Sequence, residues 1–169
     1  MAATYTPIAT TTLGSATSSV TFNSISGSYT DLILIVSSGS TTTGGTCNLT
    51  LNNDTTTTYS YTYLEGQDGT TPNAISGRGT STSSIPISGI NVGPGSIPNT
   101  YIAQIMNYAN TTTYKTVLSR SNIIRAYSAV TATVGLWRST SAVTRIDLTH
   151  SSSTFPASST FTLYGVKAA

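Results

Sequence analysis

Hydrophobic and polar residues alternate along most of this chain. The alternation is clearest in segments 20–22, 47–51, 59–63, 130–136 and 160–163. A period of two places one set of side chains on each face of a strand, and the enrichment in Thr, Val, Ile and Tyr suits such strands. No stretch carries a helical stripe longer than two turns. The pattern therefore predicts half-buried antiparallel strands, with the apolar set of each segment facing a core.

Two segments are apolar at successive positions. Residues 32–36 and 101–106 are predicted to be strands in the middle of a sheet, covered on both faces. Turn-forming sequences such as Gly44-Gly45 and Asn52-Asn-Asp separate the strand segments at short intervals. Eight to ten short strands spaced in this way predict an all-β fold, an antiparallel β-sandwich that is jelly-roll-like, formed as a single domain by residues 1–169.

Segment 71–99 departs from the pattern. It holds four of the six prolines and five of the 14 glycines, and it predicts one long Gly/Pro-rich loop that cannot form a central strand. The segment is also apolar, so it must pack on something. It either covers a sheet of its own domain or forms an arm on a neighbouring subunit. The second interpretation gives five candidate partner-contact residues: Ile85, Ile87, Ile90, Val92 and Ile97.

Three tyrosines share one face of a predicted strand: Tyr59, Tyr61 and Tyr63. They are the remaining candidates for contact with a partner, because tyrosine offers rigid amphipathic contact area. Such a stripe is also typical of the edge of a core or of a subunit interface. A third interpretation is that the rings stack on sugars, with Trp137 contributing elsewhere.

Composition narrows the class of partner. The chain has 35 Thr and 26 Ser against 12 charged residues, and its net charge is +2. A dedicated nucleic-acid binder needs clustered Lys and Arg, so no nucleic-acid partner is expected. The longest apolar run is far shorter than a membrane helix, and no targeting segment is visible, so no membrane partner is expected. Short hydroxyl side chains lose little entropy when an interface orders them, which favours contact with other proteins.

Catalytic groups are not visible in the pattern. The single histidine, His150, ends a predicted strand and is expected to be solvated or to cap it, and the single cysteine, Cys47, is expected to be a small core residue. Glu65 and Asp68 lie in a Gly-rich segment and are interpreted as turn residues rather than a weak cation site. We therefore expect no enzyme, no cofactor, no metal and no small-molecule substrate.

The charges that exist are unevenly distributed. Four of the five acids lie in residues 31–68, whereas five of the seven cations lie in residues 115–145. This is either scatter on solvated strands or a sign that the two halves meet partners of opposite charge. Arg145 and Asp147 are two residues apart and are expected to pair with each other.

Four stretches together resemble a known group of proteins. They are Ser28-Tyr-Thr-Asp-Leu-Ile-Leu-Ile-Val, Asn107-Tyr-Ala-Asn-Thr-Thr-Thr-Tyr-Lys-Thr-Val-Leu-Ser-Arg, Val134-Gly-Leu-Trp-Arg-Ser-Thr, and Ser159-Thr-Phe-Thr-Leu-Tyr-Gly-Val. They look like small Ser/Thr-rich virion structural proteins of tailed bacteriophages, of the cyanophage type. The resemblance spans about residues 5–166 and is weakest in segment 71–99.

The resemblance implies a non-enzymatic structural role in the virion, in a protein made in the host cytoplasm. The first hypothesis for this role is a capsid cement or decoration protein on the capsid exterior. Such a protein would form a trimer with other copies of itself and bind the major capsid protein. Alternatives are a tail-associated adhesion or receptor-binding module, a head–tail connector or tail-tube subunit, and, last, a glycan hydrolase. The resemblance brings no catalytic residues.

Overall fold

The computed structural model describes residues 4–42, 44–69, 73–89, 99–124 and 128–167, and within these ranges it contains strands only. No helix among these residues is long and apolar enough to cross a membrane. The strands are β1 (Tyr5–Thr12), β2 (Ser19–Phe22), β3 (Asp31–Ser38), β4 (Cys47–Leu51), β5 (Tyr59–Gln67), β6 (Asn73–Thr82), β7 (Ile85–Pro86), β8 (Asn99–Met106), β9 (Lys115–Ile124), β10 (Ser128–Trp137), β11 (Ile146–His150) and β12 (Thr160–Val166).

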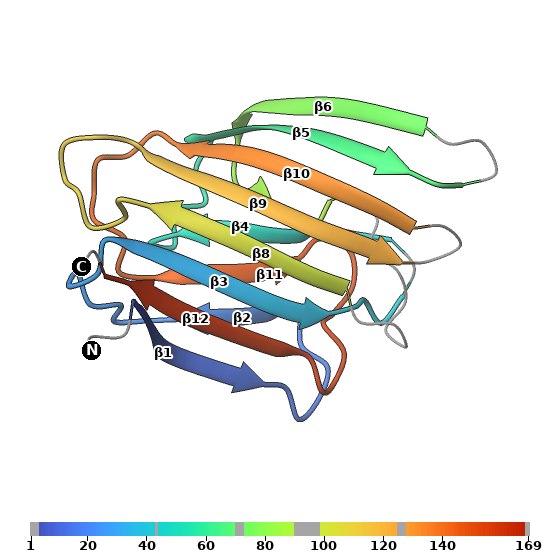
Figure 1. The fold of residues 1–169 in the computed structure, drawn as a ribbon, viewed down its shortest axis with the longest axis horizontal. Coiled ribbons are helices and arrows are strands. Elements are labelled where there is room, and N and C mark those ends of the chain that lie inside the picture. Colours follow the sequence, from blue (N-terminus) through green and yellow to red (C-terminus); the bar gives the residue numbers. More distant parts are fainter. Residues whose placement is uncertain (1–3, 43, 70–72, 90–98, 125–127, 168–169) are drawn as a thin grey trace.

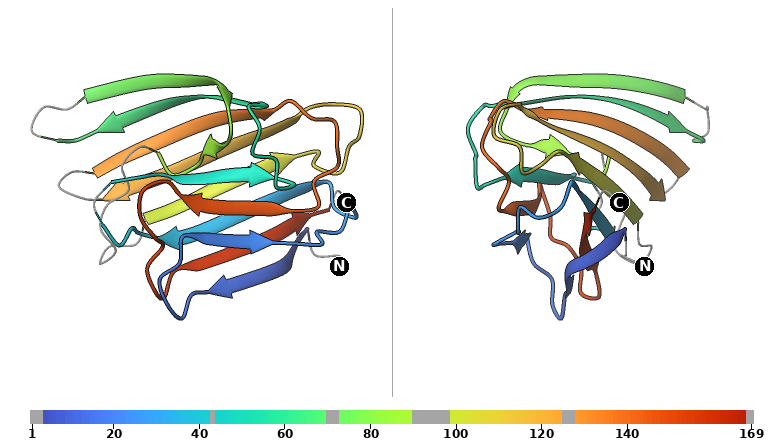
Figure 2. Two further views of the ribbon diagram at one scale, coloured as in Figure 1. Left: turned by 180° about the vertical axis from the view of Figure 1, so that it is seen from behind. Right: turned by 60° about the vertical axis from the view of Figure 1, so that its left-hand side comes forward.

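These strands form two antiparallel sheets of unequal size. The large sheet has the order β1-β12-β3-β8-β9-β10-β5-β6, and the small sheet has the order β2-β11-β4-β7. Figure 1 views the large sheet with the small sheet behind it, and Figure 2 shows the small sheet from the opposite side. The predicted all-β antiparallel sandwich is confirmed. The eight-against-four arrangement leaves the ends of the large sheet extending past the small one, which separates the fold from an eight-stranded jelly roll.

One core cluster fills the space between the sheets. The large sheet contributes residues such as Leu34, Ala103 and Phe161, and the small sheet contributes Leu49 and Leu148, all fully buried. Close packing of this kind excludes water from apolar surface, which is the main force that holds two sheets together. Cys47 is completely buried in the same cluster, so its predicted role as a small core residue is confirmed, and burial raises the pKa of its thiol.

The orientation of β10 is the opposite of the predicted one. Val130 and Val134 were expected to face the core, but they are 64% and 50% exposed, whereas Thr131 and Gly135 of the same strand face inward. Gly135 has to face inward because Ile85 occupies the space where a side chain would be: an added Cβ would lie 2.5 Å from Cγ2 of Ile85. Trp137, which is also on the inward set, is 2% exposed.

The two continuous apolar segments are covered on one face only. In β3 and β8 buried residues alternate with half-buried and exposed ones, so that Ile35 is 37% and Met106 43% exposed. Both strands do lie in the middle of the large sheet, as predicted. The predicted cover on the second face is wrong within this chain, because the other layer of the sandwich packs only on the inner face.

Segment 71–99 is not one long loop. Residues 73–82 form β6, the edge strand of the large sheet, and Ile85–Pro86 form β7, the edge of the small sheet. Edge positions explain how the segment joins the sheets despite its composition, since Pro86 needs no ladder hydrogen bond on the open side. The chain crosses from the large sheet to the small one at Ser83 and Ser84, which closes one side of the sandwich (Figure 2).

Candidate functional site

The outward face of the large sheet carries an exposed apolar surface. It lies on five adjacent strands, in the order β3, β8, β9, β10 and β5. We call this the apolar face, and it comprises Ile35, Leu64, Met106, Leu118, Ile124, Val130 and Val134, which are between 37% and 67% exposed. Monomeric soluble proteins seldom expose contiguous apolar surface over so many neighbouring strands.

Strand register makes the apolar face continuous. Leu118 lies opposite Val134, and Gln104 of the next strand lies opposite Leu118. A parallel row joins Ile35, Ile102 and Arg120 through directly paired positions. Arg120 thus stands among aliphatic neighbours, and a hollow of about 450 Å³ surrounds it. The surface is mainly aliphatic, with the polar side chains of Gln104 and Arg120 near its centre.

A second candidate surface is a trough at the β7 edge of the sandwich. One end is a hollow of about 310 Å³ between Tyr61 and Tyr63 of β5 and Asn48 of β4. A second hollow of about 420 Å³ runs over the outward face of the small sheet. Asn48, Ser83 and Ser84 line both hollows, so the two adjoin each other. We call the joined hollows the trough.

The two tyrosines of the trough lie over glycines of the neighbouring strand. Tyr63 is paired with Gly77 and Tyr61 with Gly79. A Cβ placed on Gly77 would lie 2.6 to 2.7 Å from three atoms of the Tyr63 side chain, and one on Gly79 would lie as close to Tyr61. The missing side chains on β6 therefore let each ring rest against the strand. Both tyrosines stay half-buried, and burial raises the pKa of Tyr63.

The other end of the trough contains an ion pair set among hydroxyl groups. Arg145 donates from Nε and Nη2 to the carboxylate of Asp147 at 2.7 to 2.9 Å, which confirms the predicted local pair. Thr21 donates to the same carboxylate at 2.7 Å. Burial opposes ionisation of Asp147, but these hydrogen bonds outweigh it and lower its pKa. The pair leaves this end of the trough polar without net charge.

The predicted partner-contact residues divide into three groups. Ile85, Ile87 and Tyr59 are completely buried in the chain's own core. For the two isoleucines this favours cover of the chain's own sheet over an arm on a neighbour. Tyr61 and Tyr63 lie in the trough, so they are the predicted residues that the structure leaves accessible. Ile90, Val92 and Ile97 lie outside the described residues.

Tyr59 belongs to a buried network with Trp137. The two rings stack with centroids 6.2 Å apart, and the Tyr59 hydroxyl accepts a hydrogen bond from the backbone N–H of Leu51. Trp137 donates from Nε1 to Asp54 at 2.7 Å. Burial opposes ionisation of Asp54, but hydrogen bonds from Thr56, Trp137 and Thr58 outweigh it and lower its pKa to about 2. Trp137 is therefore structural and does not join the accessible tyrosines.

His150 and Glu65 differ from their predicted environments. His150 is 7% exposed, and neither ring nitrogen has a hydrogen-bond partner among the described residues. Burial lowers its pKa, so it is not a solvated strand end. Glu65 lies within β5 rather than in a turn and accepts a hydrogen bond from buried Thr131 at 2.8 Å. Asp68 follows β5 and accepts a hydrogen bond from the backbone N–H of Ser128.

Among the described residues no group of three or more His, Cys, Asp and Glu side chains could hold a metal ion.

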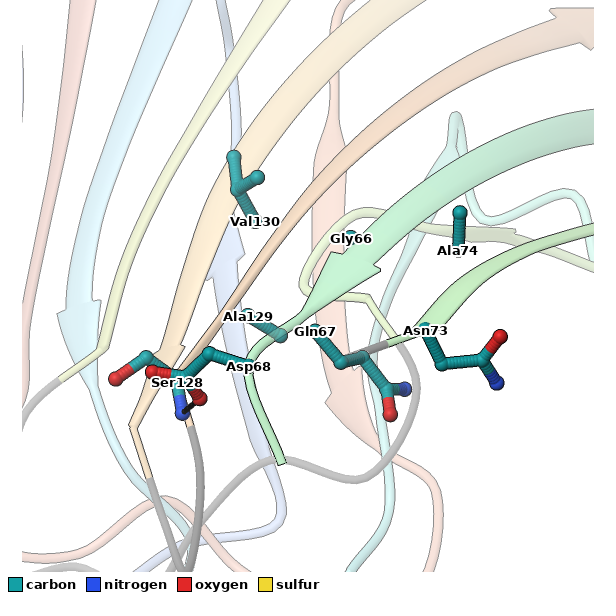
Figure 3. Close-up of a pocket in the computed structure, with 8 residues that line it drawn as sticks. All are labelled: Gly66, Gln67, Asp68, Asn73, Ala74, Ser128, Ala129 and Val130. Carbon is teal, nitrogen blue, oxygen red and sulfur yellow. Dashed lines mark hydrogen bonds between the residues drawn. The ribbon is translucent and has the colours of Figure 1, made fainter. Parts of the chain in front are cut away.

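A further hollow lies at the ends of β5, β6 and β10. Its volume is about 670 Å³, and Figure 3 shows its lining, which runs from Gly66 and Ala74 to Val130. Its lining includes the amides of Gln67 and Asn73 and one carboxylate, Asp68, which accepts a hydrogen bond from Ser128. Among the described residues this lining has no aromatic ring, so the hollow is a weaker candidate for ring stacking than the trough.

Sequence reasoning missed most of both surfaces. The apolar face was hidden because its residues share the period-two pattern of a core strand. The polar residues of the trough come from β2, β4, β11 and the β6–β7 connection, which are far apart in the chain. The available signals were the tyrosine stripe opposite the glycine pair at 77 and 79 and the predicted Arg145–Asp147 pair.

Comparison of the chain with models of protein families, with curated proteins and with solved structures gives no match.

Proposed function

We propose that this protein is a non-enzymatic structural component of a tailed-phage virion, acting as a capsid cement or decoration protein on the shell exterior. The apolar face is the observation that carries the proposal. Five strands spaced by about 4.8 Å, with three rows of outward side chains about 7 Å apart, give a surface of roughly 400 Å². A patch of this size equals the largest apolar patch on a typical soluble protein, and such patches are often functional.

The partners are further copies of this chain, as a trimer, and the major capsid protein. The sequence resemblance supports this choice of partner, and the surface chemistry supports a contact that depends little on ion pairs. Binding to the assembled shell stabilises it by mass action, and many copies add their contributions. The contact surface we propose is the apolar face and not segment 71–99, because Ile85 and Ile87 are buried within the chain.

The test replaces Leu118 by lysine and Val134, which lies directly opposite it, by glutamate, so that the two new charges have opposite sign. Both side chains are about half exposed, so folding should be nearly unaffected while self-association and binding to the shell are lost. Light scattering gives the mass in solution, and antibody labelling of phage particles gives the position. Thr12→Lys is the control, because Thr12 is exposed on the edge strand β1 and belongs to neither the apolar face nor the trough.

Particles should keep the wild-type protein in about 1 M salt, where the screening length falls to about 3 Å. Particles that lack it should lose heat or osmotic resistance. A wild-type chain that is monomeric both in solution and on the particle contradicts the trimer. Label confined to the tail contradicts the capsid position and favours the second candidate, a tail-associated adhesion module. The accessible pair Tyr61 and Tyr63 supports that second candidate.

A further inference from the structure

We propose that the trough binds a neutral oligosaccharide, with sugar rings packed on Tyr61 and Tyr63 and sugar hydroxyls bound by Asn48 and the Arg145–Asp147 pair. This inference does not rest on the position of the protein in a virion, because the site lies wholly within one chain. It uses a different surface from the apolar face.

The aromatic end suits the apolar side of a sugar ring. Pyranose rings expose C–H groups on one face, and these pack against the face of an aromatic ring. Because Gly77 and Gly79 carry no side chain, each tyrosine ring rests on β6 and is held at the wall of the trough. Residues two apart on a strand are separated by about 7 Å. The two rings can therefore contact neighbouring units of an extended oligosaccharide.

The polar end suits sugar hydroxyl groups. Asn48, at the junction of the two hollows, has an amide that can both donate to and accept from a hydroxyl. The side chain of Arg145 is 39% exposed while it holds Asp147, so the guanidinium keeps a surface for a ligand. An adjacent donor and acceptor of this kind can bind the two hydroxyls of a diol.

Charge and size select the class of ligand. Arg145 is paired with Asp147, and the other lining residues are Ser, Thr, Asn, Tyr and Pro, so the trough carries no net charge. An anionic glycan or a phosphate would find no unpaired cation there. The volume of the hollow at the tyrosine end lies at the lower limit of the range for small-molecule sites, which is roughly 300–1,000 Å³. The adjoining second hollow extends this space. The trough thus fits a short neutral chain better than a single large group.

The experiment titrates the purified full chain with cellohexaose, laminarihexaose and maltohexaose, and with heparin as an anionic probe. Calorimetry measures affinity, and the NMR signal of the Asn48 side-chain amide reports the place of binding. We expect at least one neutral hexaose to bind and to shift that signal. Tyr63→Ala should weaken binding by about tenfold or more. Tyr114→Ala is the matched control, because Tyr114 is an exposed tyrosine outside the trough and should leave affinity unchanged.

A second variant guards against loss of folding. Ser83→Trp adds a side chain at an exposed position that lines both hollows, so it should block binding without removing any core contact. Three outcomes overturn the proposal: no neutral hexaose binds, heparin alone binds, or binding survives both Tyr63→Ala and Ser83→Trp. A change of molecular mass on Ser83→Trp in the absence of sugar also overturns it, because the trough would then be a contact between copies of this chain.

Discussion

The two outward faces of the sandwich are built from the same kind of strand but differ in chemistry. The face of the large sheet presents aliphatic side chains such as Leu118 and Val134 around Arg120. The face of the small sheet presents Ser, Thr and Asn side chains around the paired Arg145 and Asp147. Burying the first face would release water from apolar surface, whereas burying the second would require replacement of its hydrogen bonds.

This difference shows that hydroxyl-rich composition does not imply a uniformly polar surface. On β9 and β10 the hydroxyl residues Ser119, Ser121 and Thr131 face inward. Leu118, Val130 and Val134 of the same two strands face outward. On β4 and β11 the order is the usual one, with Leu49 and Leu148 inside. The same alternation therefore produces an exposed apolar face on the large sheet and a polar, hydrated face on the small sheet.

The largest effect is expected from Gly135→Ala. This substitution tests whether Gly135 of β10 faces the core, on which the comparison of the two outward faces depends. The new Cβ would lie 2.5 to 2.8 Å from three carbon atoms of Ile85, so β7 or β10 would have to move. We expect a loss of about 2 kcal/mol or more in the free energy of unfolding, measured by urea denaturation. Gly66→Ala is the matched control on the outward side, where the nearest atom is 4.0 Å away.

That control should be neutral or slightly stabilising, because alanine restricts the unfolded chain. Equal effects of the two substitutions would mean that β10 does not face the core with Gly135. The apolar face would then be wrongly assigned.

Acid should weaken the side of the molecule that holds Asp54. The folded pKa of about 2 lies below the ordinary value of about 3.9, so this carboxylate stabilises the fold above pH 4. That contribution should be lost progressively as the pH falls from about 4 to 2. Trp137→Phe removes one donor to Asp54 and so raises its folded pKa toward the ordinary value. In this variant the acid-induced loss should therefore be smaller and should end at a higher pH.

Urea denaturation between pH 7 and pH 2 measures both profiles. Asp54→Asn serves as the reference, since its stability should depend less on pH in the same range. Identical profiles for the wild-type chain and Asp54→Asn would contradict the network. The substitution of Trp137 should also lower stability at every pH, because its ring is buried against Tyr59.

The smallest expected effect belongs to the ion pair on the small sheet. Arg145→Met removes the pair, but the arginine side chain is 39% exposed, so the free energy of unfolding should fall only slightly. The difference from wild type should shrink in about 1 M salt. A larger, salt-independent loss would show that Asp147, which is 7% exposed, depends on Arg145 as a buried charge does.

The sequence by itself was sufficient for the class of fold. Period-two segments and the residues that favour strands predicted an all-β sandwich, because alternation is a local property of a strand next to a core. It was also sufficient for the buried Cys47 and for the pairing of Arg145 with Asp147, two residues apart. The tyrosine stripe pointed to one end of the trough, and the predicted Arg145–Asp147 pair to the other.

The tertiary structure decided which face of each strand is buried. Val130 and Val134 alternate with Thr131 as a core set would, but the insertion of Ile85 against Gly135 turns that set outward. Segment 71–99 joined the sheets because edge positions tolerate proline and glycine, which composition alone does not reveal. Alternation separates the residues of a strand into two faces, but it does not determine which of the two faces is buried. That choice depends on contacts between residues far apart in the chain, here 50 positions, from 85 to 135.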